Sequence, residues 1–162
     1  MPKEIERKFL LSSGEWRANA RGFFCRQGYL AINERCTARV RVAGGRAFVT
    51  VKGRRIGISR DEYEYPVPVE HANEMLERLC EQPIIEKTRH LVREGGVLWE
   101  IDEFSGLNQG LVLAEVELRD ETQLVALPRW IGKEVTADPK YLNASLVRRP
   151  YSLWSDAEKA GM

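Results

Sequence analysis

Hydrophobic and polar residues alternate along the first two thirds of the chain, as they do in strands that bury one face. The stretch "PKEIERKFLL" shows the pattern, with Glu4, Glu6 and Lys8 on one face and Ile5 and Phe9 on the other. The alternation predicts eight strands, and "AGG" at 43–45 and "EGG" at 94–96 predict hairpin turns between them. The strands are expected near residues 3–10, 26–32, 36–43, 46–53, 60–68, 84–93, 97–104 and 111–119.

Helical spacing of apolar residues appears in three shorter segments. Residues 70–81 form one predicted helix, and a second is predicted at 121–127, where the proline that follows ends it. A third is predicted at 139–149, with proline in the favoured first position. The chain is therefore predicted to form a single mainly β (α+β) domain over residues 1–162, with short helices packed outside. Its tail from about residue 150 is predicted to be loosely ordered.

Composition limits the class of protein. The 162 residues are 43% hydrophobic and 30% charged, with a net charge of +1. A nucleic-acid-binding protein usually has a marked basic excess, and a membrane helix needs about 20 apolar residues in a row. We therefore expect neither partner, and the charged N-terminus argues against a secretory signal. Cys25, Cys36 and Cys80 lack the spacing of a zinc site or a disulfide framework, which favours a cytoplasmic protein.

Charged residues recur on one face of seven of the predicted strands, and on several strands they share one sign. Lys52 lies alone on its strand, whereas Arg60, Glu62 and Glu64 share another. The like-charged pairs are Arg39 with Arg41, Lys87 with Arg89, Glu100 with Asp102, and Glu115 with Glu117.

A solvent-exposed sheet face would explain any one of these strands. The whole set is harder to explain in this way, because like charges two residues apart along a strand lie only about 6.7 Å apart and repel. If the strands close into an eight-stranded barrel, this face can point inward. There a polyphosphate would neutralise the cations and a divalent metal the acids. In this interpretation Glu4 and Glu6 hold metal, and Lys8 contacts phosphate.

These motifs resemble those of the CYTH superfamily, also called triphosphate tunnel metalloenzymes. "EIERK" is similar to its E-x-E-x-K signature, and the motifs that follow in family order are "RVR", "VKG", "EYE", "EKTR", "WEID" and "AEVE". The resemblance covers residues 3 to about 143. It implies a closed antiparallel eight-stranded β-barrel that forms a tunnel, in which triphosphates are cleaved or cyclised with Mg²⁺ or Mn²⁺.

The resemblance also implies roles for individual residues. The implied metal ligands are Glu4, Glu6, Glu62, Glu64, Glu115 and Glu117. The implied substrate-binding residues are Lys8, Arg39, Arg41, Lys52, Lys87, Arg89 and Lys133, the last on a C-terminal segment that plugs one tunnel mouth. The implied catalytic residues are Lys8, Lys87, Arg89 and Asp102.

The resulting hypothesis is a metal-dependent triphosphatase that removes a terminal phosphate from inorganic tripolyphosphate without a phosphoenzyme. Tripolyphosphate is favoured because chains that open with "EIERKFL" resemble the bacterial inorganic triphosphatases. A thiamine triphosphatase, a class IV-type adenylate cyclase acting on ATP, a non-catalytic polyphosphate-binding module and a purely structural barrel stay open. The expected partner is a small polyphosphate, and a homodimer is left open.

Overall fold

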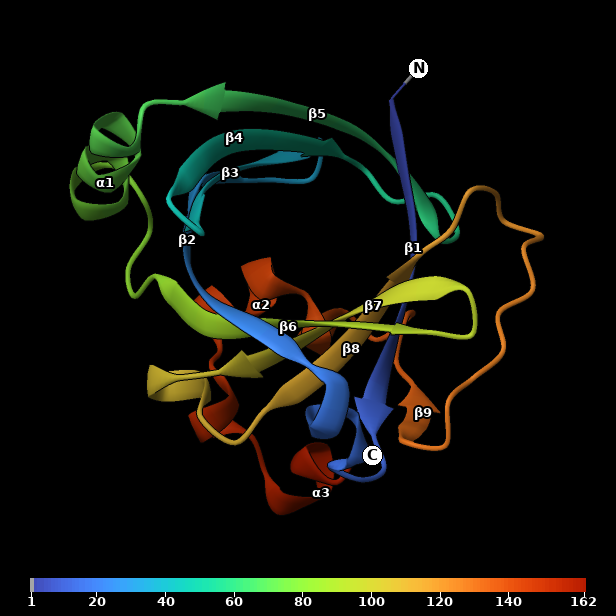
Figure 1. The fold of residues 1–162 in the computed structure, drawn as a ribbon. Helices are drawn as coiled ribbons and strands as arrows, with labels where there is room; N and C mark the ends of the chain where they lie inside the picture. Colours follow the sequence, from blue (N-terminus) through green and yellow to red (C-terminus); the bar gives the residue numbers. More distant parts are fainter. Residues whose placement is uncertain (1) are drawn as a thin grey trace.

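The structure, a computed structural model, describes residues 2–162. Eight of its strands form a closed antiparallel barrel, in the order β5-β4-β3-β2-β6-β7-β8-β1, and β5 pairs with β1 to close it (Figure 1). The predicted fold class is confirmed. The barrel strands are β1 (Lys3–Leu11), β2 (Arg21–Ile32), β3 (Cys36–Ala43), β4 (Arg46–Gly53), β5 (Ser59–Val67), β6 (Ile85–Glu94), β7 (Val97–Phe104) and β8 (Val112–Glu117).

Two tight turns set the register of neighbouring strands. Gly44 and Gly45 have φ of 57° and 77°, and Gly95 and Gly96 have φ of 65° and 78°. Two consecutive residues of positive φ match the right-handed twist of the strands they join, and glycine adopts this conformation without a steric cost. The β3–β4 and β6–β7 hairpins predicted from these glycines are confirmed.

Helix α1 (Val69–Arg78) lies outside the barrel (Figure 1). Its buried residues Ala72 and Leu76 pack with Val40 and Ala47, which face outward from β3 and β4. The helix is three residues shorter at its C-terminus than its apolar spacing predicts.

The C-terminal part of the chain returns to the barrel and packs against its inner face. The predicted helix at 139–149 is divided at Leu142 into a 3₁₀ turn, η3 (Pro139–Tyr141), and helix α2 (Asn143–Arg148). Figure 1 shows α2 within the outline of the ring of strands. The C-terminal segment and the strands share one hydrophobic cluster. It includes Tyr141, Leu146, Val147 and Trp154 from the C-terminal segment, and Tyr29, Ile85, Phe104 and Leu113 from the strands. We call residues 139–148 the plug.

The predicted helix at 121–127 is wrong, because this segment is irregular and leaves Leu124 95% exposed. Strand β9 (Ile131–Glu134) follows this segment and pairs with the C-terminal end of β1. The strand has four residues, too few for the alternation to predict it. Strand β2 also begins five residues earlier than predicted. Gly22 is the second residue of this strand, and a Cβ there would lie 2.9 Å from the His90 ring, so a glycine interrupts the usual alternation.

The two ends of the chain also contain structure that the pattern missed. A 3₁₀ turn, η1 (Glu15–Asn19), precedes β2. The tail, expected to be loosely ordered, forms η4 (Tyr151–Leu153) and helix α3 (Asp156–Lys159). Ser155 and Glu158 form a reciprocal capping box at the start of α3, which satisfies backbone donors that would otherwise fray. Among the residues described, no helix is long and apolar enough to cross a membrane.

Candidate functional site

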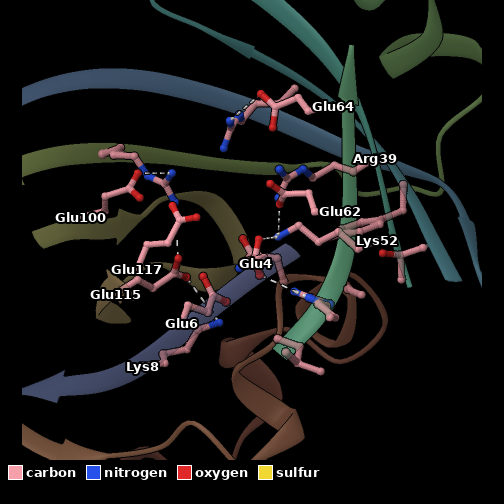
Figure 2. A pocket seen from close by; sticks show the side chains of 18 of the residues that line it. Glu4, Glu6, Lys8, Arg39, Lys52, Glu62, Glu64, Glu100, Glu115 and Glu117 are labelled. Carbon is pink, nitrogen blue, oxygen red and sulfur yellow. Dashed lines mark hydrogen bonds and ion pairs between the residues drawn. The ribbon is translucent and has the colours of Figure 1, made fainter. Parts of the chain in front are cut away.

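The inner face of the barrel surrounds a cavity of about 190 Å³ whose walls are mostly charged. Figure 2 shows the acidic and basic side chains reaching into it from strands on opposite sides. Twelve of the fourteen site residues predicted from the sequence line this cavity. They are Glu4, Glu6, Lys8, Arg39, Arg41, Lys52, Glu62, Glu64, Lys87, Arg89, Glu115 and Glu117.

On one side of the cavity, Glu4 lies between two cations (Figure 2). It pairs with Lys52 and, at 3.3 Å, with Nε of Arg60, and Lys52 also lies 3.5 Å from Glu62. Burial alone would raise the pKa of Glu4, but the hydrogen bond with Glu62 and the two cations hold it well below its ordinary value. Burial and the same hydrogen bond raise the pKa of Glu62 to about 7. Glu4 is therefore a firmly ionised anchor for both cations.

On the other side, acids from β1 and β8 face one another. Glu6 is the register partner of Glu117, and Lys8 is the register partner of Glu115. Lys8 Nζ lies 3.4 Å from Glu115, so that acid is balanced. Glu6 lies 3.6 Å from the guanidinium group of Arg55, but burial together with the charges of Glu115 and Glu4 outweighs the nearby cations and raises its pKa to about 8. Burial, Glu4 and Glu100 likewise raise the pKa of Glu117. This wall therefore carries more negative charge than its neighbouring cations neutralise.

The predicted catalytic acid Asp102 lies behind the cavity wall and is 1% exposed. It accepts hydrogen bonds from Lys87 Nζ at 2.8 Å and from Arg89 Nε and Nη2 at 2.8 and 2.9 Å. Burial would raise its pKa, but these cations lower it well below the ordinary range. The resemblance implied a catalytic role for Asp102, but this residue is not among those that line the cavity, because Lys87 and Arg89 on β6 cover it. Asp102 instead fixes the two cations that do reach the cavity.

Two guanidinium groups of β3 complete the basic wall. Within residues 2–162, the buried Nε atoms of Arg39 and Arg41 have no hydrogen-bond partner. Nη2 of Arg41 lies 3.8 Å from Glu64, which is an ion pair but too long for a hydrogen bond. A buried donor without an acceptor costs about 1–3 kcal/mol, so these two N–H groups are suited to an anionic ligand.

Lys133 is not among the described residues that line the cavity. It lies on β9, outside the barrel, and its Nζ donates to the carbonyl oxygen of Gly161. The prediction that Lys133 reaches substrate from the plug is not supported by this placement. A plug does exist, but residues 142–144 form its cavity-facing part.

Several residues of the site were given no role by the sequence reasoning. The alternation placed Arg60 and Glu100 on the charged faces of their strands, and both line the cavity, but neither was among the predicted site residues. Arg55, which lies 3.6 Å from Glu6, comes from the loop before β5 and had no periodic signal. The plug residue Asn143 accepts a hydrogen bond from Lys87 Nζ at 3.0 Å. No local sequence pattern predicts this contact, because it depends on the return of the C-terminal chain to the barrel.

The donor set fits a divalent cation held partly by its substrate. Within the described part of the chain, no three His, Cys, Asp or Glu side chains form a ready-made metal site. Mg²⁺ commonly uses one or two carboxylates and completes its shell with phosphate oxygens and water. Glu6 and Glu117 offer two facing carboxylates whose raised pKa values reflect burial and crowded negative charge. A cation bound there would relieve this repulsion.

Comparisons with known proteins agree with this geometry. An inorganic triphosphatase of Acetivibrio thermocellus is 52% identical over 151 residues, which are 93% of this chain and 97% of that protein. An inorganic triphosphatase of Nitrosomonas europaea is 39% identical over 88% of this chain and 95% of its own length. A solved structure described as an inorganic triphosphatase is 36% identical, with a TM-score of 0.63 over 91% of this chain and 95% of that one. A family model of the CYTH domain matches residues 2–151, and the chain belongs to the CYTH domain family.

Proposed function

We propose that this protein is a metal-dependent triphosphatase that hydrolyses the terminal phosphoanhydride bond of inorganic tripolyphosphate inside its barrel. The observation that carries the proposal is the wall of cations around the cavity inside the closed barrel, with the unpartnered guanidinium donors of Arg39 and Arg41. Burying so many ions costs several kcal/mol each unless they are paired. A polyanion would supply the missing acceptors.

The substrate-binding residues in this proposal are Arg39, Arg41, Lys52, Lys8, Lys87 and Arg89. Phosphoryl transfer depends mainly on positioning and on neutralising charge, because its transition state spreads charge over the phosphate oxygens. Lys8, Lys87 and Arg89 would stabilise the charge that grows on the departing pyrophosphate. Asp102 acts through Lys87 and Arg89, whose donor groups it holds at 2.8–2.9 Å, so we assign it a positioning role.

The family implies a divalent metal, and we propose Mg²⁺, with Mn²⁺ as a substitute. Glu6 and Glu117 are its best-placed ligands, with Glu115 beside them on β8. Glu4, Glu62 and Glu64 line the opposite wall and are proposed for a second ion. Bound here, the metal would neutralise phosphate oxygens and lower the pKa of a water molecule for in-line attack.

Tripolyphosphate suits the cavity better than an organic triphosphate does. Pockets for drug-sized ligands usually have volumes of about 300–1,000 Å³, larger than the 190 Å³ found here. Among the described lining residues the one aromatic side chain is Tyr29, which is 5% exposed and packs in the core beside the plug. It therefore offers little surface on which an adenine or a thiazolium ring could stack. Tyr63 and Tyr65 are exposed and lie outside the cavity lining.

The experiment compares phosphate release from tripolyphosphate, ATP and thiamine triphosphate at equal Mg²⁺ concentration. We expect kcat/KM to be highest for tripolyphosphate, and cyclic AMP to be absent from the products of ATP. A preference for ATP or thiamine triphosphate would refute the choice of substrate while leaving the triphosphatase proposal intact. No turnover of any of the three, with Mg²⁺ or with Mn²⁺, would refute the enzyme proposal itself.

We extend the proposal to a reducing, cytoplasmic location. Cys25, Cys36 and Cys80 are all free thiols, and free thiols are typical of proteins kept in a reducing compartment.

A further inference from the structure

Asn143 is the first residue of α2, and its side chain connects the plug to the barrel wall. Its Oδ1 accepts one hydrogen bond from Lys87 Nζ at 3.0 Å and another from Gln27 Nε2 at 2.7 Å. Asn143 also lines the charged cavity. One group thus contacts a proposed catalytic cation and faces the space that the substrate would fill.

The chemistry of its neighbours fixes which way this amide points. A lysine ammonium donates hydrogen bonds and accepts none, so the atom facing Lys87 must be the oxygen. The amide nitrogen then lies on the other side of the planar group. Within residues 2–162, both hydrogen bonds of the Asn143 side chain run to Oδ1 and none is donated by Nδ2.

Buried neighbours hold the amide in this orientation. Lys87 is 1% exposed and is itself held by Asp102, at 2.8 Å. Gln27 is fully buried, and its Oε1 has no partner within the described chain, so its hydrogen bond to Asn143 is the one its side chain makes there. An amide oriented by two buried donors keeps its free N–H groups in place before a ligand arrives, which limits the entropy lost on binding.

A second cation of the cavity, Lys8, also donates a hydrogen bond to the plug. Lys8 Nζ donates to the carbonyl oxygen of Tyr141 at 3.1 Å, two residues before Asn143. Lys8 and Lys87 therefore both reach the plug. Two cations beside a neutral N–H donor suit an end phosphoryl group of a polyphosphate, which has more free oxygens than an internal one. Here it is the end that leaves as part of the pyrophosphate.

We propose that Asn143 binds the phosphoryl group nearest the plug through its side-chain N–H donors, while Lys87 and Gln27 hold the Oδ1 atom of Asn143. The proposal rests on the triphosphatase function proposed above and adds a substrate-binding residue from outside the barrel strands. In this role the plug closes one end of the barrel and also contributes a residue to the site.

Two substitutions separate a donor from a structural acceptor. Asn143→Ala removes both halves of the amide, whereas Asn143→Asp keeps an oxygen for Lys87 and Gln27 but replaces the donor with a negative charge. Affinity for sodium tripolyphosphate is measured by titration calorimetry in the presence of chelator, and KM is measured in Mg²⁺. Ser145→Ala, on the same helix but outside the cavity lining, is the matched control.

We expect Asn143→Ala to weaken binding and raise KM about 10-fold, as loss of a hydrogen bond to a charged group does. Asn143→Asp should weaken binding by a further factor of about 10, through repulsion of the phosphate. Ser145→Ala should match the wild type. If Asn143→Asp binds and turns over substrate like the wild type, Asn143 serves only as an acceptor for Lys87 and the proposal is overturned.

A variant of Gln27 tests whether the effects of the Asn143 variants come from the orientation of the amide and not from a disturbed fold. Gln27→Met keeps the volume of the buried side chain but frees the Asn143 amide from one orienting donor. We expect KM to rise about threefold in the wild-type background and not at all in the Asn143→Ala background, because coupled residues are not additive. Equal effects in both backgrounds would count against an oriented donor.

The two proposals fail in different ways. If the wild type releases no phosphate yet binds tripolyphosphate with the expected order of variants, the proposed function fails and the role of Asn143 stands. If the wild type is active but the Asn143 variants bind and react normally, the role of Asn143 fails alone.

Discussion

Glu6 on β1 and Glu117 on β8 are register partners, so two carboxylates face each other across neighbouring strands inside the barrel. Like charges directly opposite one another in a sheet are destabilising. The pKa of Glu6 is raised to about 8 by burial and by the charges of Glu115 and Glu4, and that of Glu117 is raised by burial and by Glu4 and Glu100. This arrangement supports the proposal that a cation binds between them.

Replacement of Glu117 by glutamine should therefore impair metal use and leave the fold intact. Within residues 2–162 Glu117 forms no ion pair, so its loss breaks no cross-barrel contact. We expect the Mg²⁺ concentration for half-maximal activity to rise about 10- to 100-fold, the range seen when support for a metal ligand is removed. The measurement is a Mg²⁺ titration of tripolyphosphate hydrolysis, with the exposed Glu34→Gln as control. Unchanged Mg²⁺ dependence would remove Glu117 from the proposed ligands.

The same variant separates an enzyme from a polyphosphate-binding module. Removing an acid from the cavity lowers repulsion toward the anion, so a metal-free binding module should bind tripolyphosphate as well as before or better. An enzyme should instead lose turnover at limiting Mg²⁺.

Asp102→Asn should strongly destabilise the protein. Asp102 is 1% exposed and neutralises Lys87 and Arg89, and leaving buried charges unpaired typically costs about 3–5 kcal/mol. Chemical denaturation should show a loss of this order in the free energy of unfolding. The control is Glu103→Gln, which weakens the exposed Arg17–Glu103 pair and should cost less than about 1 kcal/mol. Similar costs for the two variants would contradict the assignment of Asp102 as the buried anchor.

Lys87 should make substrate affinity depend on pH. Burial and the charge of Arg89 lower its pKa from 10.5 to about 8, although Asp102 opposes the shift. Lys87 is thus charged below pH 8 and neutral above it, so affinity for tripolyphosphate should fall as pH rises through about 8.

This pH dependence is measured by calorimetry between pH 6.5 and 9.5, in parallel with Lys87→Met. The variant should bind more weakly at pH 7 and should lack the component of the decline that Lys87 causes. Ionisation of tripolyphosphate itself contributes equally to both proteins. A decline of the same size in Lys87→Met would assign it to another group, and Lys3→Met, outside the cavity, controls for loss of a surface charge.

We predict direct attack by water and no phosphoenzyme. The hydroxyl groups of the described cavity lining belong to Thr37 and Tyr29, and neither described histidine is among the lining residues. Enzyme in excess over radiolabelled tripolyphosphate, quenched in denaturant during one turnover, should retain no covalent phosphate. Label that accumulates and then decays at the rate of product release would establish the opposite.

The strand alternation predicted the inner wall well, because the side-chain direction in a strand depends only on position along it. Glu4, Glu6, Lys8 and the cations of β3 and β6 all face the cavity as expected. The pattern could not assign depth within the wall, however. Asp102 and Glu100 share one face of β7, yet Asp102 lies beneath Lys87 and Arg89 while Glu100 reaches the cavity.

The C-terminal third was harder to predict because long-range contacts determine it. Residues 121–127 have helical spacing but are irregular, and Val125 packs against the core while Leu124 and Leu127 stay exposed. Conversely, the polar tail is ordered by specific contacts, including Arg149 with Glu158 at 2.7 Å and the edge of Trp154 against Tyr141. Asn143 and Lys133 depend on where the returning chain lies, and no local pattern encodes that.

The central claim is that this barrel hydrolyses tripolyphosphate with the help of a divalent metal. It is tested most directly by following the reaction with ³¹P nuclear magnetic resonance, with Mg²⁺ and with chelator. We predict that each tripolyphosphate yields one orthophosphate and one pyrophosphate with Mg²⁺, and that chelator abolishes the reaction. Intact tripolyphosphate in the presence of Mg²⁺ or Mn²⁺, or equal turnover with chelator, would contradict it.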